Sequence, residues 1–307
     1  MKANRPSRTA EHNALFRAIE YSRPPQARIV SDPFAFSFLG TSFRLTALLS
    51  HVPGLRALLC RYIDYRWPGS RTSLVARTRL IDEYLARALG SGVRQIVLLG
   101  AGFDSRAYRL PGADRVQFFE IDHPNTSAKK MALVGRLFGT PPSHVRYVPV
   151  DFQTETLQQV LADAGFEARD RSLFLWEGVS NYLTEEAVRT TLSFIASLTE
   201  GTQLVFTYVD QSVICNPSGF AGGREVQRAI AKLEEPWTFG IRPERATEFL
   251  RECGLSLDSD LSAADYRRLY YGPNDRIRGY EFYHVVTAHV SPPQQRGSEQ
   301  RQEVHHA

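Results

Sequence analysis

A short apolar run that passes directly into a glycine-rich turn constrains this chain more than any other feature. Residues 95–99 read QIVLL, Gly100-Ala101-Gly102 follow, and residues 103–109 have the composition of a helix start. The order strand, tight turn, helix is typical of the first unit of a nucleotide-binding α/β domain, because glycine lets the backbone turn sharply and lie close to a ligand. A GxG turn alone is weak evidence, since many purely structural turns contain two glycines.

Short apolar runs and helix-length segments alternate along the chain after residue 94. We expect strands at residues 95–99, 116–121, 145–148, 172–176, 203–209, 254–258 and 281–287. We expect helices between them, at about residues 126–138, 154–164, 185–198 and 243–252. Alternation of this kind predicts an α/β fold with a mainly parallel sheet covered by helices on both faces.

Composition shifts divide the chain into three parts. Residues 1–90 consist of helical segments separated by proline, which predicts an N-terminal helical cap that contributes to the ligand sites. Residues 91–290 form the α/β core, with a long insertion at about 211–242 that we interpret as a lid. The tail, residues 291–307, is polar and contains proline, so we expect it to be disordered.

Composition and charge disfavour several classes of function. Of the 307 residues, 43% are hydrophobic, so a sizeable core is expected. The 37 basic and 33 acidic residues give a net charge of +4 without a dense Lys/Arg block, so no nucleic-acid partner is expected. No run is long enough to span a bilayer and the polar start lacks an apolar signal segment, so we expect no membrane partner and a cytoplasmic protein. A homodimer is left open.

The cysteines give no sign of a disulfide framework or a metal site. Cys60, Cys215 and Cys253 are odd in number and far apart, and no CxxC or His/Cys cluster accompanies them. We therefore expect no metal.

Carboxylates follow three of the expected strands. Asp122 ends the second strand, Asp151 follows the third and Glu177 ends the fourth. Because ligands of open parallel sheets bind at the carboxyl ends of the strands, we expect these side chains at one site. Asp122, assisted by Glu120 on the same side, suits ribose hydroxyls, and Asp151 with Phe152 suits an adenine ring. Each residue also has an ordinary structural interpretation, a solvated strand end or a helix cap, but the three in order are more specific.

Asp104 and Ser105 separate two cofactor classes. They stand in the turn where a dinucleotide fingerprint carries its third glycine. A pyrophosphate favours a helix N-terminus free of carboxylates, which counts against NAD and FAD. S-adenosylmethionine carries a sulfonium and an ammonium, which carboxylates attract. The sequence therefore favours a methyl-donor site in which Glu177 meets the ammonium, and a dinucleotide oxidoreductase is the disfavoured alternative.

Six stretches carry a family resemblance: VARTRLIDEYL, IVLLGAGFDSRAYRL, FFEIDHP, YVPVDF, WEGVSNYLT and EPWTFGIRPE. Together they resemble the leucine carboxyl methyltransferase-like family of class I S-adenosylmethionine-dependent methyltransferases, over about residues 8–288. The resemblance implies a Rossmann-like fold. Within the family, the chain is more similar to bacterial enzymes that O-methylate polyketide-type small molecules.

The resemblance implies a set of cofactor-binding residues: Arg77, Gly100, Ala101, Gly102, Asp122, Asp151, Phe152 and Glu177. In such enzymes the residue matching Arg77 contacts the methionine carboxylate. Phe152 departs from the leucine that the family often carries there. Arg17 on the first helix is a further candidate to reach the cofactor, and a solvated helix cation is its alternative interpretation.

The predicted reaction is O-methylation of a carboxylate or a phenolic hydroxyl of a small molecule in secondary metabolism. A carboxylate needs no general base, whereas a phenol needs one within hydrogen-bond reach. His123, His144 and Tyr182 are candidates for that role and none is assigned, so the catalytic residues stay unknown. A protein C-terminal carboxyl methyltransferase and a non-catalytic cofactor-binding module are the alternatives.

The acceptor pocket is expected between the N-terminal helices and the insertion. Aromatic residues are frequent there, with ordinary core as the alternative interpretation: Phe34, Phe36, Phe38, Phe43, Tyr62, Tyr65, Trp67, Phe220, Trp237 and Phe239. Arg224 and Arg242 are either partners of an acceptor carboxylate or surface cations.

Overall fold

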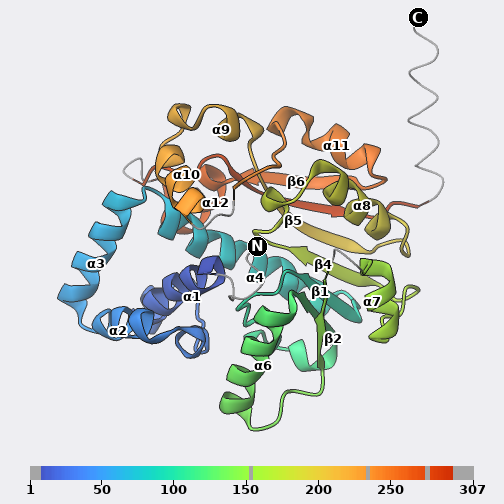
Figure 1. Cartoon of the computed structure of the whole chain (residues 1–307), viewed down its shortest axis with the longest axis horizontal. Helices are drawn as coiled ribbons and strands as arrows, with labels where there is room; N and C mark the ends of the chain where they lie inside the picture. The colour runs from blue at the N-terminus through green and yellow to red at the C-terminus, as the bar shows by residue number, and fades with distance from the viewer. Residues whose placement is uncertain (1–7, 152–154, 233–235, 274–276, 293–307) are drawn as a thin grey trace, which may run out of the picture.

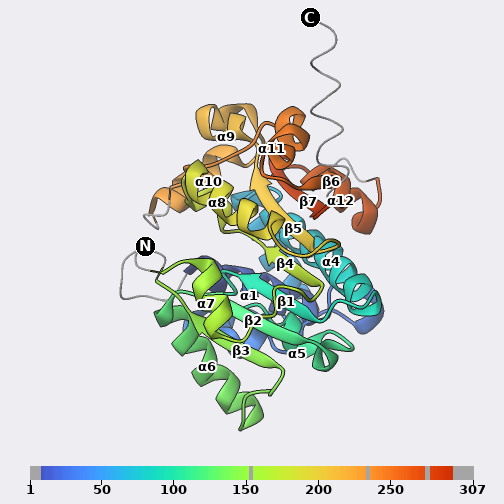
Figure 2. The same ribbon diagram turned by 90° about the vertical axis from the view of Figure 1, so that its right-hand side faces the viewer.

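The structure is a computed structural model that describes residues 8–151, 155–232, 236–273 and 277–292. Its described residues contain one seven-stranded sheet with the order β3-β2-β1-β4-β5-β7-β6 (Figures 1 and 2). The strands are β1 (Gln95–Leu99), β2 (Gln117–Asp122), β3 (Val145–Pro149), β4 (Ser172–Trp176), β5 (Gln203–Val209), β6 (Ser256–Ser262) and β7 (Tyr283–His289). Strands β1 to β5 pair in parallel, and β7 is antiparallel to β5 and β6. The prediction of a mainly parallel sheet is confirmed.

Helices precede the sheet, connect its strands and cover both of its faces (Figure 2). The helices are α1 (Arg8–Tyr21), α2 (Thr41–Leu49), α3 (Pro53–Arg66), α4 (Ser70–Gly90), α5 (Arg106–Arg109), α6 (Pro124–Phe138), α7 (Leu157–Asp163), α8 (Glu185–Ala196), α9 (Gln211–Cys215), α10 (Gly223–Lys232), α11 (Ala246–Glu252) and α12 (Ala263–Tyr271). No helix in the described ranges is long and apolar enough to cross a membrane.

The central strands are apolar throughout because both faces of the sheet are covered. In β1, Ile96 and Leu98 belong to a buried cluster that also contains residues of α4. Val97 and Leu99 belong to a second cluster, on the opposite face, with residues of α8. Continuous burial of this kind is what the unbroken run QIVLL predicts for a parallel strand.

The N-terminal helices rest on the glycine turn that follows β1. Phe103 of that turn stacks on Phe38, with ring centroids 5.6 Å apart. Ala14 and Ile19 of α1 complete the same buried cluster. The helix α4, by contrast, packs against the sheet through Ile81 and other side chains, so part of the predicted cap belongs to the central core.

The C-terminal third differs most from the sequence expectation. The strand β6 lies at 256–262 rather than 254–258, because residues up to Leu255 close the turn after α11, where Gly254 has a φ of +87°. The helix α12 was not predicted at all. It begins with a capping box, in which the Ser262 side chain accepts from the backbone of Asp265 and the Asp265 side chain accepts from the backbone of Ser262.

The described parts of the insertion, residues 211–232 and 236–242, are folded against the sheet. It contains α9 and α10, which bury Val213, Val226 and Ile230. Its role as a lid stays a prediction. In the predicted tail, Ser291 is buried, and residues 293–307 lie outside the described part of the chain.

Candidate functional site

The glycine turn is fixed to the end of the neighbouring strand β2. The backbone N–H groups of Gly100 and Ala101 both donate to the carbonyl oxygen of Ile121, at 2.9 and 3.0 Å. Gly100 has a φ of +70°, and a Cβ at this position would lie 2.4 Å from Cγ2 of Val179. Glycine is therefore required here both by the backbone conformation and by the space available.

Asp122 binds the other side of the turn. Its carboxylate accepts from the backbone N–H of Gly102 and, at 2.7 Å, from that of His123. Burial raises the pKa of Asp122, and the two backbone donors oppose that rise. Its own carbonyl accepts from Val150 N at 2.9 Å, which brings Asp151 to the same edge of the sheet. The predicted grouping of the turn with two strand-end carboxylates is therefore present.

The residues that follow Asp122 and Asp151 in the sequence are also candidates. His123 is the N-cap of α6, where its Nδ1 accepts from Asn125 N at 3.3 Å, so it has a structural role at the start of this helix. Phe152, predicted to pack against adenine, lies outside the described residues.

Arg77 and Glu177 meet on the opposite side of the turn from Asp122. Nε of Arg77 donates to Oε1 of Glu177 at 2.7 Å, and the guanidinium lies over the ring of Tyr283 at 4.6 Å. Burial alone would raise the pKa of Glu177, but the guanidinium groups of Arg106 and Arg77 lower it below its ordinary value. Glu177 is therefore ionised at neutral pH.

Arg106 connects this ion pair to the turn. Its guanidinium donates to Asp82 Oδ1 and Glu177 Oε2, both at 2.8 Å, and to the Asp104 carboxylate. Burial alone would raise the pKa of Asp104, but Arg106 holds it at about 2. From its place in the turn, the charge of Asp104 is expected to attract a bound cation. This expectation is wrong in detail, because the cation beside Asp104 is Arg106 of the chain itself.

A second series of contacts runs from the turn into the N-terminal helices. Arg109 donates to both oxygens of Asp82, at 2.6 and 2.7 Å, and to Ser105 Oγ at 3.0 Å. Ser105 Oγ donates in turn to Asp32 at 2.7 Å. Nε of Arg17 donates to the same oxygen of Asp32 at 2.8 Å. The N-terminal segment is thus bonded to the turn through buried polar groups.

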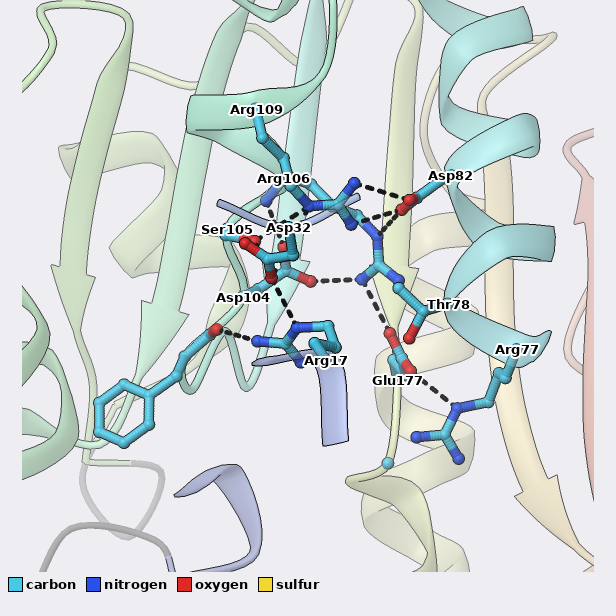
Figure 3. Close-up of polar contacts among 12 residues, drawn as sticks. Arg17, Asp32, Arg77, Thr78, Asp82, Asp104, Ser105, Arg106, Arg109 and Glu177 are labelled. Carbon is cyan, nitrogen blue, oxygen red and sulfur yellow. Dashed lines mark hydrogen bonds and ion pairs between the residues drawn. The ribbon is translucent and has the colours of Figure 1, made fainter. Parts of the chain in front are cut away.

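Together these contacts form one arginine–carboxylate network (Figure 3). Its charged members are Arg17, Arg77, Arg106, Arg109, Asp32, Asp82, Asp104 and Glu177. Four positive and four negative side chains leave no net charge. Such balance is required because a buried ion without a partner is very unfavourable.

Arg17 is a buried member of this network rather than a solvated helix cation. Besides Asp32, its Nη2 donates to the carbonyl oxygen of Phe103 at 2.6 Å. Arg17 therefore reaches the turn itself; its contact with a cofactor stays a prediction.

Glu120 does not assist Asp122 as expected. It is 2% exposed and forms an ion pair with Lys130 of α6 at 2.8 Å. Its other oxygen accepts from Tyr108 OH at 2.9 Å. Alternation along β2 places Glu120 and Asp122 on one side, as predicted, but α6 covers the position of Glu120.

Asp32, Asp82, Arg106 and Arg109 were not predicted as members of the site. One signal was available: Arg106 and Arg109 are three residues apart in a helical segment, so they share a face. Their partners Asp32 and Asp82 lie in distant segments of the chain and carry no local signature.

The remaining candidates are spread over the fold. His144 is half-buried, with Nε2 2.9 Å from the Ala107 carbonyl oxygen. Tyr182 is half-buried, and Arg224 and Arg242 are exposed. Of the predicted aromatic lining, Phe38, Trp237 and Phe239 are core residues, whereas Tyr62 and Tyr65 are exposed. Within the described ranges no group of His, Cys, Asp or Glu could hold a metal ion.

Comparison with known proteins identifies the family. A family model described as leucine carboxyl methyltransferase matches residues 10–196, which contain the turn and the whole network. A Mycobacterium sp. (strain JLS) protein named "Putative S-adenosyl-L-methionine-dependent methyltransferase" is 31% identical over 302 residues, covering 84% of this chain and 92% of its own. A Frankia alni protein with the same description is 30% identical over 276 residues, with coverages of 88% and 91%.

Solved structures of low sequence identity share the fold. A "putative methyltransferase" from Thermobifida fusca covers 89% of this chain and 97% of its own, with a TM-score of 0.58 at 13% identity. A DUF574 family protein from Streptomyces avermitilis covers 90% and 97%, with a TM-score of 0.55 at 14% identity. These likenesses agree with the predicted Rossmann-like fold of class I methyltransferases. From the family model and these relatives, the chain belongs to the leucine carboxyl methyltransferase family.

Proposed function

We propose that this chain transfers a methyl group from S-adenosylmethionine to a carboxylate or phenolic oxygen of a small molecule of polyketide type. Membership of the family and the naming of its relatives make the chain an S-adenosylmethionine-dependent methyltransferase. The observation that supports the site is the position of the glycine turn, between Asp122 on one side and the Arg77–Glu177 pair on the other.

The residues present fit this cofactor. Asp122 offers carboxylate oxygens to a ribose diol beside a turn that lets backbone come close. The ion pair with Glu177 uses Nε of Arg77. The two terminal nitrogens of Arg77 point away from Glu177 (Figure 3), where they would hold the methionine carboxylate. Glu177 is ionised, and its two oxygens already accept from Arg77 and Arg106, so a bound ammonium would share this carboxylate with the two arginines. The bound cofactor supplies an activated methyl group whose leaving group is neutral.

The chain's own task is then to orient the acceptor, because alignment of nucleophile, carbon and leaving group supplies much of the rate. A carboxylate acceptor is already ionised at neutral pH and needs no general base, whereas a phenol needs one within hydrogen-bond reach. Both acceptors are therefore kept in the proposal, with the carboxylate as the simpler one because it needs no further catalytic group.

Calorimetric titration tests the cofactor site. The purified chain should bind S-adenosylmethionine and S-adenosylhomocysteine but not NAD. The variant Asp122→Ala should weaken binding by about tenfold to a hundredfold, as for a lost charged hydrogen bond. Asp258→Ala, which removes an exposed carboxylate on β6, is the control. Unchanged affinity of Asp122→Ala would contradict the assignment of Asp122.

Transfer of a labelled methyl group tests the acceptor. Aromatic and aliphatic carboxylic acids, phenols and a peptide with a C-terminal leucine are offered in parallel. The family description names a leucine carboxyl as the alternative acceptor. Labelling of a small acid supports the proposal, and labelling of the peptide alone would replace it by the protein-modifying alternative. Cofactor binding without transfer to any of them would favour a non-catalytic module.

A further inference from the structure

The helices α2 and α3 carry an apolar surface that faces solvent. It consists of the exposed side chains Leu45, Leu48, Leu49, Val52, Leu55, Leu58, Tyr62 and Tyr65, which we call the α2–α3 surface. Twelve large hydrophobic side chains are exposed among the described residues, so two thirds of them lie within this one stretch of 21 residues. Leu58 is 66% exposed and Tyr65 is 85% exposed.

Folding of the chain does not account for these apolar side chains. Every residue of both helices is described, and each helix has one buried residue, Ala47 in α2 and Ile63 in α3. Both helices lie at one end of the molecule, beyond α1 and away from the sheet (Figure 1). A concentrated apolar surface on a protein marks a site of association with another surface.

The charged side chains of residues 41–66 themselves are almost all positive. Arg44, Arg61 and Arg66 are exposed, and Arg56 is half-buried. Residues 41–66 contain a single carboxylate, Asp64, whose two oxygens accept from Arg71 at 3.1 and 2.6 Å. The surface therefore combines leucine side chains with an excess of guanidinium groups and tyrosine rings.

This charge pattern selects between two kinds of occupant. A second copy related by twofold symmetry would place the same cationic surface on both sides of the interface, without carboxylates to compensate. An anionic lipid bilayer complements both features, because leucines enter the boundary of the acyl chains while arginines meet the headgroups. Tyrosine and arginine are also residues that suit a membrane–water boundary.

We propose that the α2–α3 surface docks this protein peripherally on anionic lipid bilayers. Docking of this kind needs no spanning helix, so it is compatible with the absence of one from the described ranges. The sequence expectation of no membrane partner rested on the lack of a spanning run and of an apolar signal segment, and not on the exposed faces of helices. The proposal concerns binding of the cap and does not rest on the proposed function.

Co-sedimentation with vesicles tests the proposal on the full chain without cofactor or acceptor. Vesicles of phosphatidylcholine alone are compared with vesicles that also contain phosphatidylglycerol, at low and at high salt. The chain should bind the anionic vesicles and be released by salt. The double variant Arg61→Gln/Arg66→Gln should weaken binding about thirtyfold, and Leu48→Gln/Leu58→Gln at least tenfold.

Matched variants elsewhere on the surface control for general effects of charge and polarity. Arg251→Gln/Arg268→Gln removes two other exposed arginines, and Leu137→Gln/Leu269→Gln removes two other exposed leucines. Both should bind vesicles as the parent does. Equal weakening by the control variants, or no binding of the parent to anionic vesicles, would overturn the proposal.

Light scattering tests the alternative occupant of the α2–α3 surface, a second copy of the chain. The parent should be monomeric at the concentrations used for sedimentation. A dimer that Leu48→Gln/Leu58→Gln dissociates would assign the surface to self-association and overturn docking on lipid.

Discussion

Replacement of Arg106 by methionine tests whether the arginine–carboxylate network stabilises the cofactor turn. Arg106 is 3% exposed and donates to Asp82, Asp104 and Glu177. Asp82 and Glu177 each keep a second arginine in the variant. Asp104 loses its nearest cation and keeps the backbone N–H of residue 106, at 2.7 Å, as a donor. The main cost of the substitution therefore falls on Asp104.

The structure gives the scale of that cost. The pKa of Asp104 lies at about 2, against an ordinary 3.8, and this lowering corresponds to roughly 2 kcal/mol in favour of the ionised form. Removal of one member of a buried ion pair typically costs about 3–5 kcal/mol, because the remaining charge is left without compensation. We expect Arg106→Met to lose about that much free energy of unfolding at neutral pH, measured by urea denaturation.

The pH dependence provides the sharper test. In the parent, the contribution of Asp104 is complete above pH 3.8 and is lost as the pH falls toward 2. In Arg106→Met, burial should raise the pKa of Asp104 above 3.8, so that its ionisation destabilises the fold at neutral pH. Protonation removes this penalty, and the difference between parent and variant should shrink as the pH falls toward about 4.

The control adds Asp104→Asn to the variant, which removes the uncompensated charge and should recover part of the stability. A loss below about 1 kcal/mol, or a loss that stays constant with pH, would refute the role given to Arg106.

Two further substitutions test the packing around the turn and beneath it. Gly100→Ala should lose about 1–3 kcal/mol more unfolding free energy than Gly92→Ala. Both glycines have a positive φ, but only Gly100 has a neighbour, Val179, in the way of a Cβ; equal losses in urea denaturation would show that Val179 yields freely. Lys130→Met should cost up to about 3–5 kcal/mol because Glu120, 2.8 Å away, is left buried without its cation. Adding Glu120→Gln should restore most of this stability, and a thermal melt without such recovery would count against the ion pair.

The elements that follow from a local pattern of apolar residues could be predicted from the sequence. The bounds of β1, β4 and β5 agree with the sequence expectation, because apolar runs bounded by turn residues are visible without knowledge of their partners. The strand β6 was displaced because it is an edge strand with the polar sequence SLDSDLS. Its Asp260 accepts from Tyr208 OH, at 2.5 Å, and contacts His284 Nδ1 at 2.8 Å. These partners come from two other strands.

The functional site likewise has one part that the sequence predicts and one part that it does not. The positions of Gly100, Asp122 and Glu177 follow from where strands end, which the sequence shows directly. The pairing of the buried charges does not follow from the ends of the strands. Ser105 is hydrogen-bonded to Asp32, 73 residues away in the sequence, and Arg106 to Asp82, 24 residues away. Such pairs depend on how α1 and α4 pack, and a single sequence carries no local record of that packing.

The arginine–carboxylate network also has a consequence for the order of events during synthesis. Arg77 is made a hundred residues before Glu177, its partner. At roughly 5–20 residues per second, Arg77 leaves the ribosome on the order of ten seconds before Glu177 can meet it. Since an unpaired charge resists burial, α4 cannot settle fully on the sheet until β4 has emerged. The helix α4 is thus translated early but reaches its final place only after β4 has emerged, and the cofactor turn is completed only when it does.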